Sequence, residues 1–179
     1  RGNMAREYAR YVPKSSGKYY GAYRVGDIMF IVFDCGEDKP DDFWVYAGLT
    51  DFDGYRTEQA AWFGELIRSK AYKSAKWRIV MNHFPPLSHM ESDNPERHGI
   101  QDITDKFLPL YNQAKIDLMI SGHTHAYEFM SPDKYDRLTF PVIVNSTESV
   151  ARIDIDGRTL KAKVTDTGGN TLKEFTISK

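Results

Sequence analysis

Residues 116–128 read Ile116-Asp117-Leu118-Met119-Ile120-Ser121-Gly122-His123-Thr124-His125-Ala126-Tyr127-Glu128. The apolar run at residues 116–120 predicts a buried strand, and the Ser121-Gly122 step predicts its end. Two histidines, one residue apart, follow directly. A strand end can turn both side chains into a cleft, and neutral imidazole is the commonest metal ligand in proteins. The stretch therefore predicts a metal site where the chain leaves a sheet.

The composition is that of a globular protein with one substantial core. Of the 179 residues, 41% are hydrophobic and 27% are charged. The net charge of -1 gives no field that would favour nucleic acid or an anionic membrane, so we expect no nucleic-acid scaffold role. No apolar run approaches the roughly 20 residues that cross a bilayer, so we expect no membrane span. The single cysteine, Cys35, excludes an internal disulfide.

Strand and helix patterns alternate through the middle of the chain, which predicts a parallel or mixed sheet with right-handed crossovers. The predicted strands are residues 19–25, 28–33, 77–81, 116–120, 140–144, 150–156, 159–164 and 172–177, with hairpins at the first pair and at the Asp156-Gly157 turn. The predicted helices are residues 5–11, 57–73 with Thr57 as the cap, and 103–114 with a kink at Pro109. Residues 34–53 and 87–102 are predicted to be irregular loops.

Three of the five histidines are expected at one edge of this sheet. His83 follows the strand at residues 77–81, just as His123 and His125 follow the strand at residues 116–120. The carboxyl ends of neighbouring strands form the edge where open α/β sheets bind ligands. We therefore predict His83, His123 and His125 as metal ligands, and interpret His89 and His98 as loop residues.

No carboxylate has a comparable claim to the site. Asp34 follows the strand at residues 28–33, but a turn or capping role is favoured for it. The acidic cluster in the following loop is interpreted as a solvated face rather than a metal cage; it consists of Glu37, Asp38, Asp41 and Asp42. Since a two-metal site needs a bridging group, the histidines alone predict only part of one.

Three motifs resemble those of the calcineurin-like metallophosphoesterases, in the form found in purple acid phosphatases. The last signature of that family is similar to Gly122-His123-Thr124-His125-Ala126-Tyr127-Glu128. The preceding signature is similar to Val80-Met81-Asn82-His83-Phe84-Pro85-Pro86. Residues 19–34 resemble the family's hairpin, and the likeness runs in order over nearly the whole chain.

The resemblance implies an α/β fold, half of the four-layer α/β/β/α sandwich of the metallophosphoesterases, with mixed sheets and flanking helices. It implies a phosphoester hydrolase, a phosphatase or phosphodiesterase, with two divalent ions such as Zn, Fe or Mn. By that likeness His83 and His123 bind one ion and His125 the other. His89 resembles a loop position that contacts substrate phosphate. A periplasmic or secreted location is favoured by the same likeness.

The family's first-half signatures, Asp-x-His and the Gly-Asp motif with its bridging Asp, are absent. The chain also opens on Arg1-Gly2-Asn3 rather than Met. We therefore expect residues 1–179 to form a single domain that is the C-terminal portion of a phosphoesterase domain, with a partial or empty metal site and little activity alone. The expected partners are a phosphoester substrate, the missing N-terminal half and, through an exposed apolar face, a second copy.

Two other classes of function stay open on the sequence. One is an interaction module that keeps the fold without its chemistry, which the shortage of carboxylates favours. The other is a mono-zinc hydrolase, because His83, His123 and His125 with one open position form a valid catalytic zinc shell.

Overall fold

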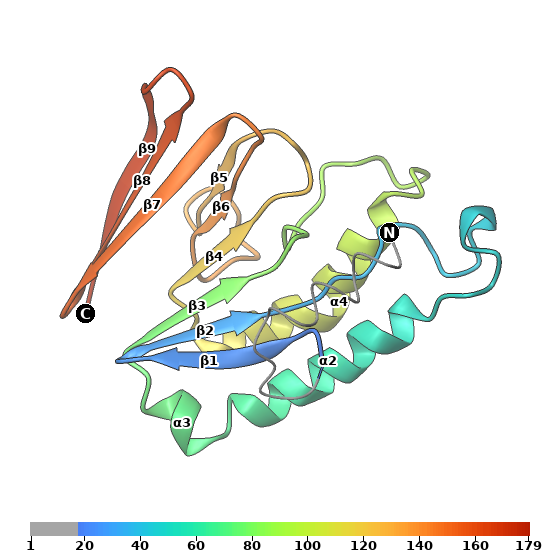
Figure 1. Cartoon of the computed structure of the whole chain (residues 1–179), viewed down its shortest axis with the longest axis horizontal. Coiled ribbons are helices and arrows are strands. Elements are labelled where there is room, and N and C mark those ends of the chain that lie inside the picture. The colour runs from blue at the N-terminus through green and yellow to red at the C-terminus, as the bar shows by residue number, and fades with distance from the viewer. Residues whose placement is uncertain (1–17) are drawn as a thin grey trace.

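The computed structural model describes residues 18–179, which form two sheets and a layer of helices (Figure 1). The predicted helix at residues 5–11 lies outside them. The larger sheet has the order β1-β2-β3-β4-β6-β5, and the smaller has the order β7-β8-β9. The strands are β1 (Gly21–Val25), β2 (Ile28–Val32), β3 (Trp77–Met81), β4 (Leu118–Ser121), β5 (Glu128–Met130), β6 (Val142–Val144), β7 (Ser149–Asp156), β8 (Thr159–Asp166) and β9 (Thr171–Ser178). The helices are η1 (Trp44–Tyr46), α2 (Phe52–Leu66), α3 (Lys70–Lys73) and α4 (Arg97–Ala114).

The larger sheet is mixed, as the order of the predicted elements requires. Strands β2, β3, β4 and β6 run parallel to one another, while β1 and β5 pair antiparallel at the two edges. The β1–β2 hairpin turns at Gly26, whose φ of 56° suits glycine. Because β2, β3 and β4 are parallel neighbours, their carboxyl ends meet at one edge.

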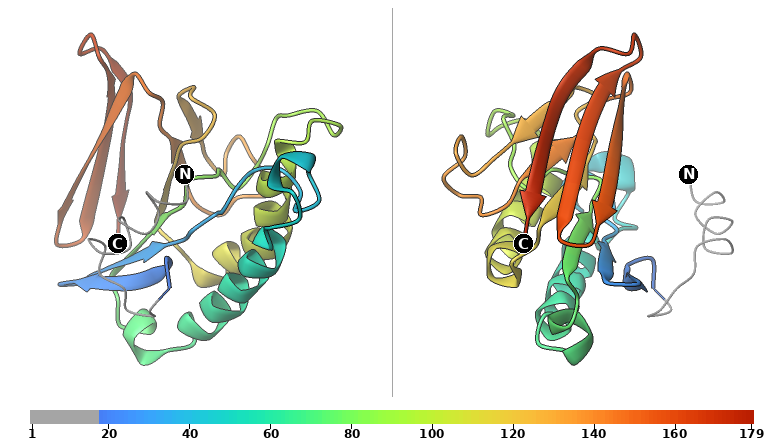
Figure 2. Two further views of the ribbon diagram at one scale, coloured as in Figure 1. Left: turned by 45° about the vertical axis from the view of Figure 1, so that its right-hand side comes forward. Right: turned by 90° about the vertical axis from the view of Figure 1, so that its left-hand side faces the viewer.

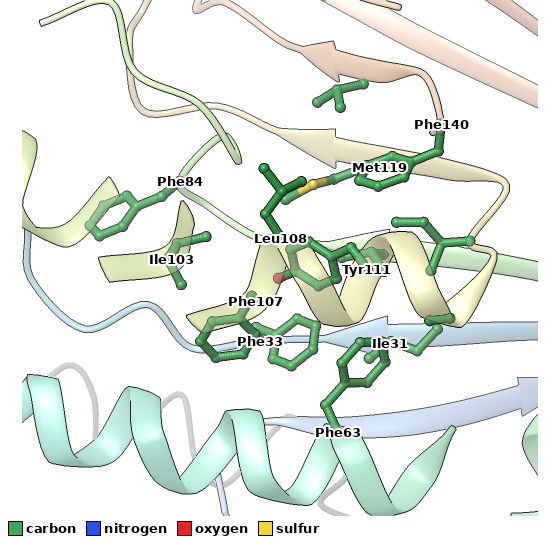
Figure 3. Close-up of a cluster of buried hydrophobic side chains, with 14 of the residues drawn as sticks. Ile31, Phe33, Phe63, Phe84, Ile103, Phe107, Leu108, Tyr111, Met119 and Phe140 are labelled. Atoms are coloured by element: carbon green, nitrogen blue, oxygen red, sulfur yellow. The ribbon is translucent and has the colours of Figure 1, made fainter. Parts of the chain in front are cut away.

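Helices α2 and α4 cover one face of this sheet (Figure 2). Aromatic side chains fill the space between them, with the ring of Phe33 5.3 Å from that of Phe63 and 5.1 Å from that of Phe107 (Figure 3). Phe63, Phe107 and Tyr111 are fully buried. Edge-to-face packing of this kind anchors both helices to the sheet.

The three-stranded sheet covers the opposite face of the larger one. Leu160, Ala162 and Val164 alternate along β8 and are all fully buried against the larger sheet. They pack against four residues of three strands, β3, β4 and β6, namely Trp77, Ile79, Leu118 and Ile143. The indole nitrogen of Trp77 also donates to the carbonyl of Gly157, at 3.1 Å, in the β7–β8 turn. The described residues thus form three layers in the order helix, sheet, sheet, and the predicted α/β class is confirmed.

Some predicted boundaries were wrong. Helix α2 begins at Phe52 rather than near Thr57, because the side chain of Asp51 accepts from the backbone N–H of Gly54. Asp41 adds two more caps, accepting from the N–H groups of Phe52 at 2.7 Å and Asp53 at 3.0 Å. Two aspartates outside the helix, Asp41 and Asp51, satisfy the first free backbone N–H groups of α2. The helix therefore extends back into the predicted loop.

Helix α4 likewise begins at Arg97, inside the loop that we predicted to reach residue 102, and it runs on through Pro109. Strand β5 was not predicted. None of the helices within residues 18–179 has the length and apolar character that crossing a membrane demands.

The capping arrangement predicts a difference between two substitutions at the start of α2. Asp51→Ala should lower the free energy of unfolding by about 1 kcal/mol, since it removes an N-cap acceptor. Thr57→Ala should change it by less than about 0.5 kcal/mol, because the Thr57 hydroxyl bonds only the Asp53 carbonyl one turn back. Urea unfolding of both variants checks this. A larger loss for Thr57→Ala would place the start of the helix where the sequence pattern put it.

Candidate functional site

The loops that follow β2, β3 and β4 line one pocket, with a volume of about 580 Å³. Each parallel strand contributes the residues just past its carboxyl end, where open α/β sheets bind ligands. The lining consists of Gly36, Glu37, Asp38, His83, Phe84, Met90, Glu96, His123, Thr124 and His125. His83, His123 and His125 therefore line one pocket, and their role as metal ligands stays a prediction.

His83 and His123 lie closest together. Their ring centroids are 5.2 Å apart and the ring planes are inclined at 81°. Two imidazoles bound to one tetrahedral ion, with metal–nitrogen distances of about 2.0–2.1 Å, have centroids roughly 5 Å apart. The pair is thus spaced as two ligands of a single ion would be.

The backbone of His123 explains how its ring reaches His83. Its φ is 74°, in the left-handed region, and the N–H of Thr124 donates to the carbonyl of Gly122 at 2.9 Å. This closes a γ-turn centred on His123. His125 also has a positive φ, 58°. Such conformations are rare for residues other than glycine and cluster at functional sites, so the turn is a second indication that this stretch serves a site.

Buried polar groups hold the loop that follows β3. The thiol of Cys35 donates to the side-chain carbonyl of Asn82, whose amide donates to the carbonyl of Phe84 at 3.1 Å. Burial raises the pKa of Cys35 to about 12, so the thiol stays protonated and remains a donor. The N–H of Gly122 donates to the carbonyl of His83 at 3.0 Å. The loops that carry His83 and His123 are therefore joined directly.

Arg56 of α2 holds the loop that follows β2. Its fully buried guanidinium donates to the carbonyls of Cys35, at 2.8 Å, and Glu37, at 3.2 Å. The charge is balanced by Asp102, at 2.6 Å, and by Asp53. A buried cation with this many partners fixes the backbone it bonds.

Gly99 of α4 lets the same loop approach the helix. Its N–H donates to the carbonyl of Asp38 at 2.7 Å. A Cβ at this position would lie 3.0 Å from the Asp38 Cα and 2.6 Å from the Phe84 ring. Only glycine permits this contact, which brings Asp38 to the pocket.

The acidic loop is only partly the solvated face that we predicted. Glu37 and Asp38 line the pocket, and a carboxylate oxygen of Asp38 lies 3.9 Å from Nε2 of His123. The other Asp38 oxygen pairs with Lys39 at 2.9 Å. The signal that would have found them is their position past the carboxyl end of β2, the same rule that singled out the histidines.

Asp34 has the turn role that the sequence favoured. Its carboxylate accepts from the N–H of Gly36 at 3.2 Å, and burial raises its pKa. Its position in this turn sets the direction in which the chain leaves β2.

Burial favours the neutral form of the two facing imidazoles. It lowers the pKa of both His83 and His123 from the ordinary value of 6.5. For His83 the next cause is the charge of His125, and for His123 it is the charge of His83; Asp38 opposes both shifts. A neutral imidazole has the lone pair that a metal ion needs.

Of the remaining histidines, one lies at the rim of the pocket and two lie outside it. His125 is exposed and lines the rim of the pocket. His89 lies in a neighbouring cavity with Nε2 3.0 Å from Glu128, and His98 belongs to α4 and contacts Asp53 at 2.8 Å. Within residues 18–179 no three His, Cys, Asp or Glu side chains form a group able to hold a metal ion. His83 and His123 therefore fit a metal ion as two of its ligands, an arrangement we call a half-site. This geometry gives no support to the mono-zinc alternative, which needs three histidines around one ion.

A sequence model of calcineurin-like phosphoesterases matches residues 1–127. The probable purple acid phosphatase 20 of Arabidopsis thaliana is 29% identical over 99 residues, which cover 54% of this chain and 22% of that protein. An uncharacterized protein of Mycobacterium tuberculosis is 32% identical over 76 residues, 42% of this chain and 14% of that protein. The chain thus spans less than a quarter of either relative.

The fold is similar to that of the purple acid phosphatase PPD1 from yellow lupin seeds. The two structures align with a TM-score of 0.57 and 15% sequence identity, over 94% of this chain and 34% of that one. At this identity the likeness concerns the fold alone.

The close contact at Gly99 predicts opposite effects for two glycine substitutions in helices. Gly99→Ala should lower the free energy of unfolding by about 1–3 kcal/mol, because the methyl group forces the Asp38 backbone and the Phe84 ring away. Gly64→Ala in α2 meets no atom within 4 Å and should stabilise the protein by up to about 1 kcal/mol through helix propensity. Chemical unfolding distinguishes them. Equal effects of the two substitutions would show that the loop that follows β2 does not depend on its contact with Gly99.

The buried imidazoles predict a pH dependence in the metal-free chain. Since folding lowers both pKa values, the unfolded chain binds more protons just below pH 6.5. The stability from His83 and His123 is complete above that pH and is lost as the pH falls through their folded pKa values. Nuclear magnetic resonance titration of the ring C–H signals should give midpoints below 6.5 for both. Midpoints at or above that value would contradict the burial.

Proposed function

The chain belongs to the calcineurin-like phosphoesterase family, and from that premise we propose that its histidine pocket is part of the active site of a metal-dependent phosphoester hydrolase. The observation that carries the proposal is the facing pair His83 and His123, with ring centroids 5.2 Å apart at the carboxyl edge of the parallel strands. The family and the purple acid phosphatase relatives support the reaction class.

His83 and His123 would hold one divalent ion through neutral imidazole nitrogens, and His125 at the rim would contribute to a second. Such ions, when bound, act as Lewis acids toward a phosphoryl group and bring water to it. The residues of this chain do three things. They supply lone pairs, they keep the loops after β2, β3 and β4 at fixed distances, and they place the charge of Asp38 on the wall of the pocket.

We also propose that the remaining ligands, carboxylates among them, come from protein outside residues 18–179, in the N-terminal half of the family's domain. The two-imidazole group and the length of the relatives support this. That segment or a second copy would pack against the apolar inner faces of the sheets. Phe30 and Ile177 on these faces are only partly buried. The homodimer and the periplasmic or secreted location stay predictions.

The proposal predicts weak, histidine-dependent metal binding by this chain. Calorimetric titration with Zn²⁺ should show binding that His83→Ala or His123→Ala weakens at least about tenfold, because each removes one of two close ligands. His98→Ala should leave it unchanged, since that ring contacts Asp53 outside the pocket. Zn²⁺ binding that ignores His83 and His123 would contradict the metal site and favour an interaction module.

The same preparation should hydrolyse p-nitrophenyl phosphate no faster than a His83→Ala His123→Ala double variant. The reason is that the described residues provide only part of a ligand shell. Histidine-dependent turnover by the chain alone would contradict the need for ligands from elsewhere, while leaving the reaction class intact.

A further inference from the structure

A second cavity, which we call the side cavity, adjoins the histidine pocket and has a volume of about 410 Å³. It lies between the loop that follows β3, the first turn of α4, and the turn that leads into β5. Its walls are mainly apolar, with side chains of Pro85, Leu87, Met90, Ile100, Ala126 and Met130. Cavities of this size and character bind small organic groups.

The side cavity and the histidine pocket share part of their lining. Met90 and Thr124 belong to both. Thr124 lies between His123 and His125 in the chain, so the two spaces adjoin at this residue. A ligand whose phosphate lies at the histidines can therefore extend an attached group into the side cavity.

A hydrogen-bonded polar group lies at one side of this apolar space. The hydroxyl of Tyr135 donates to Glu128, and the same carboxylate oxygen lies 3.0 Å from Nε2 of His89. Burial and the Glu128 contact raise the pKa of Tyr135 to about 12, which keeps it a donor. The Glu128 oxygen therefore contacts both Tyr135 and His89 at the side of the cavity. Glu128 and Tyr135 are thus positioning residues for His89.

The charge of this group also restricts what can bind. Glu128 lines the side cavity and would repel a second anionic group on the ligand. The cavity holds no lysine or arginine among its lining residues. An uncharged, apolar group satisfies both the walls and the carboxylate.

We propose that the side cavity binds the organic group of the phosphoester, and that this group is uncharged, apolar and about the size of a phenyl or indole ring. The inference deepens the proposed function and rests on it, because the phosphate must lie at the histidines. It assigns the substrate class to aryl or arylalkyl phosphoesters. Polyanionic substrates, such as sugar bisphosphates, are excluded by Glu128.

Three probes test the side cavity and the histidine site separately. The sample is the 179-residue chain with isotope-labelled methionine methyl groups. Benzyl alcohol, without metal, should shift the methyl resonances of Met90 and Met130, since it needs only the apolar walls. Methylphosphonate with Zn²⁺ should shift the ring signals of His83 and His123. Phenylphosphonate with Zn²⁺ should do both and bind at least about tenfold more tightly than methylphosphonate.

Ala126→Leu fills the mouth of the side cavity at an exposed position, and Ala71→Leu makes the same change at an exposed position on α3. Ala126→Leu should abolish the benzyl alcohol shifts and the preference for phenylphosphonate, while methylphosphonate binding is unchanged. Ala71→Leu should alter none of the three. Thermal unfolding of both variants establishes that they are folded.

Two other results would count against the side cavity or against the proposed function. If benzyl alcohol leaves Met90 and Met130 unshifted, or if phenylphosphonate binds no better than methylphosphonate, the side cavity is not a substrate site, whatever the histidines do. If benzyl alcohol binds but neither phosphonate reaches His83 and His123, the proposed function fails and the phosphoester assignment fails with it.

Discussion

The parallel pairing of β2, β3 and β4 is the constraint on which the rest of the structure depends. Register pairs Val32 with Met81 and Met81 with Ile120, so the three strands end together. The residues that follow them, Asp38, His83 and His123, come from segments far apart in the sequence and meet only because these ends align. The sheet itself is held between two apolar interfaces, one with α2 and α4 and one with β8. A shift of one strand by one residue would exchange its buried faces and separate the histidines.

The site is built from loops, yet those loops are tied to the core by buried polar groups. Cys35 and Asn82 join the turns after β2 and β3, and the backbone bond from Gly122 to His83 joins the turns after β3 and β4. Arg56 then ties the first of these loops to α2 and, through Asp102, to α4. The donors of Cys35, Asn82 and Arg56 all have acceptors, which stabilises the arrangement, while His123 and His125 have strained backbones with positive φ. This network fixes the positions of the loops that carry His83 and His123.

Much of the fold could be predicted from the sequence, because long apolar runs and the Asp156-Gly157 turn are local signals. The convergence of His83 and His123 followed from the same strand ends. The start of α2 could not be predicted, because Asp41 caps Phe52 and Asp53 from 11 and 12 residues away and outcompetes the local signal of Thr57. Strand β5 has three residues and no alternation, so it forms only because β6 lies beside it. Glu37 and Asp38 follow the carboxyl end of β2, so the strand-end rule could have found them, but their contact with α4 at Gly99 leaves no sequence pattern.

The account stands on the claim that His83 and His123 form a metal half-site of a phosphoesterase. Nitrogen resonances of the histidine rings, followed as Zn²⁺ is added to the chain, test that claim most directly. The account predicts that the ring nitrogens of His83 and His123 shift together as Zn²⁺ binds, while those of His98, bonded to Asp53, stay in place. Saturation with Zn²⁺ that leaves both rings unshifted would contradict it.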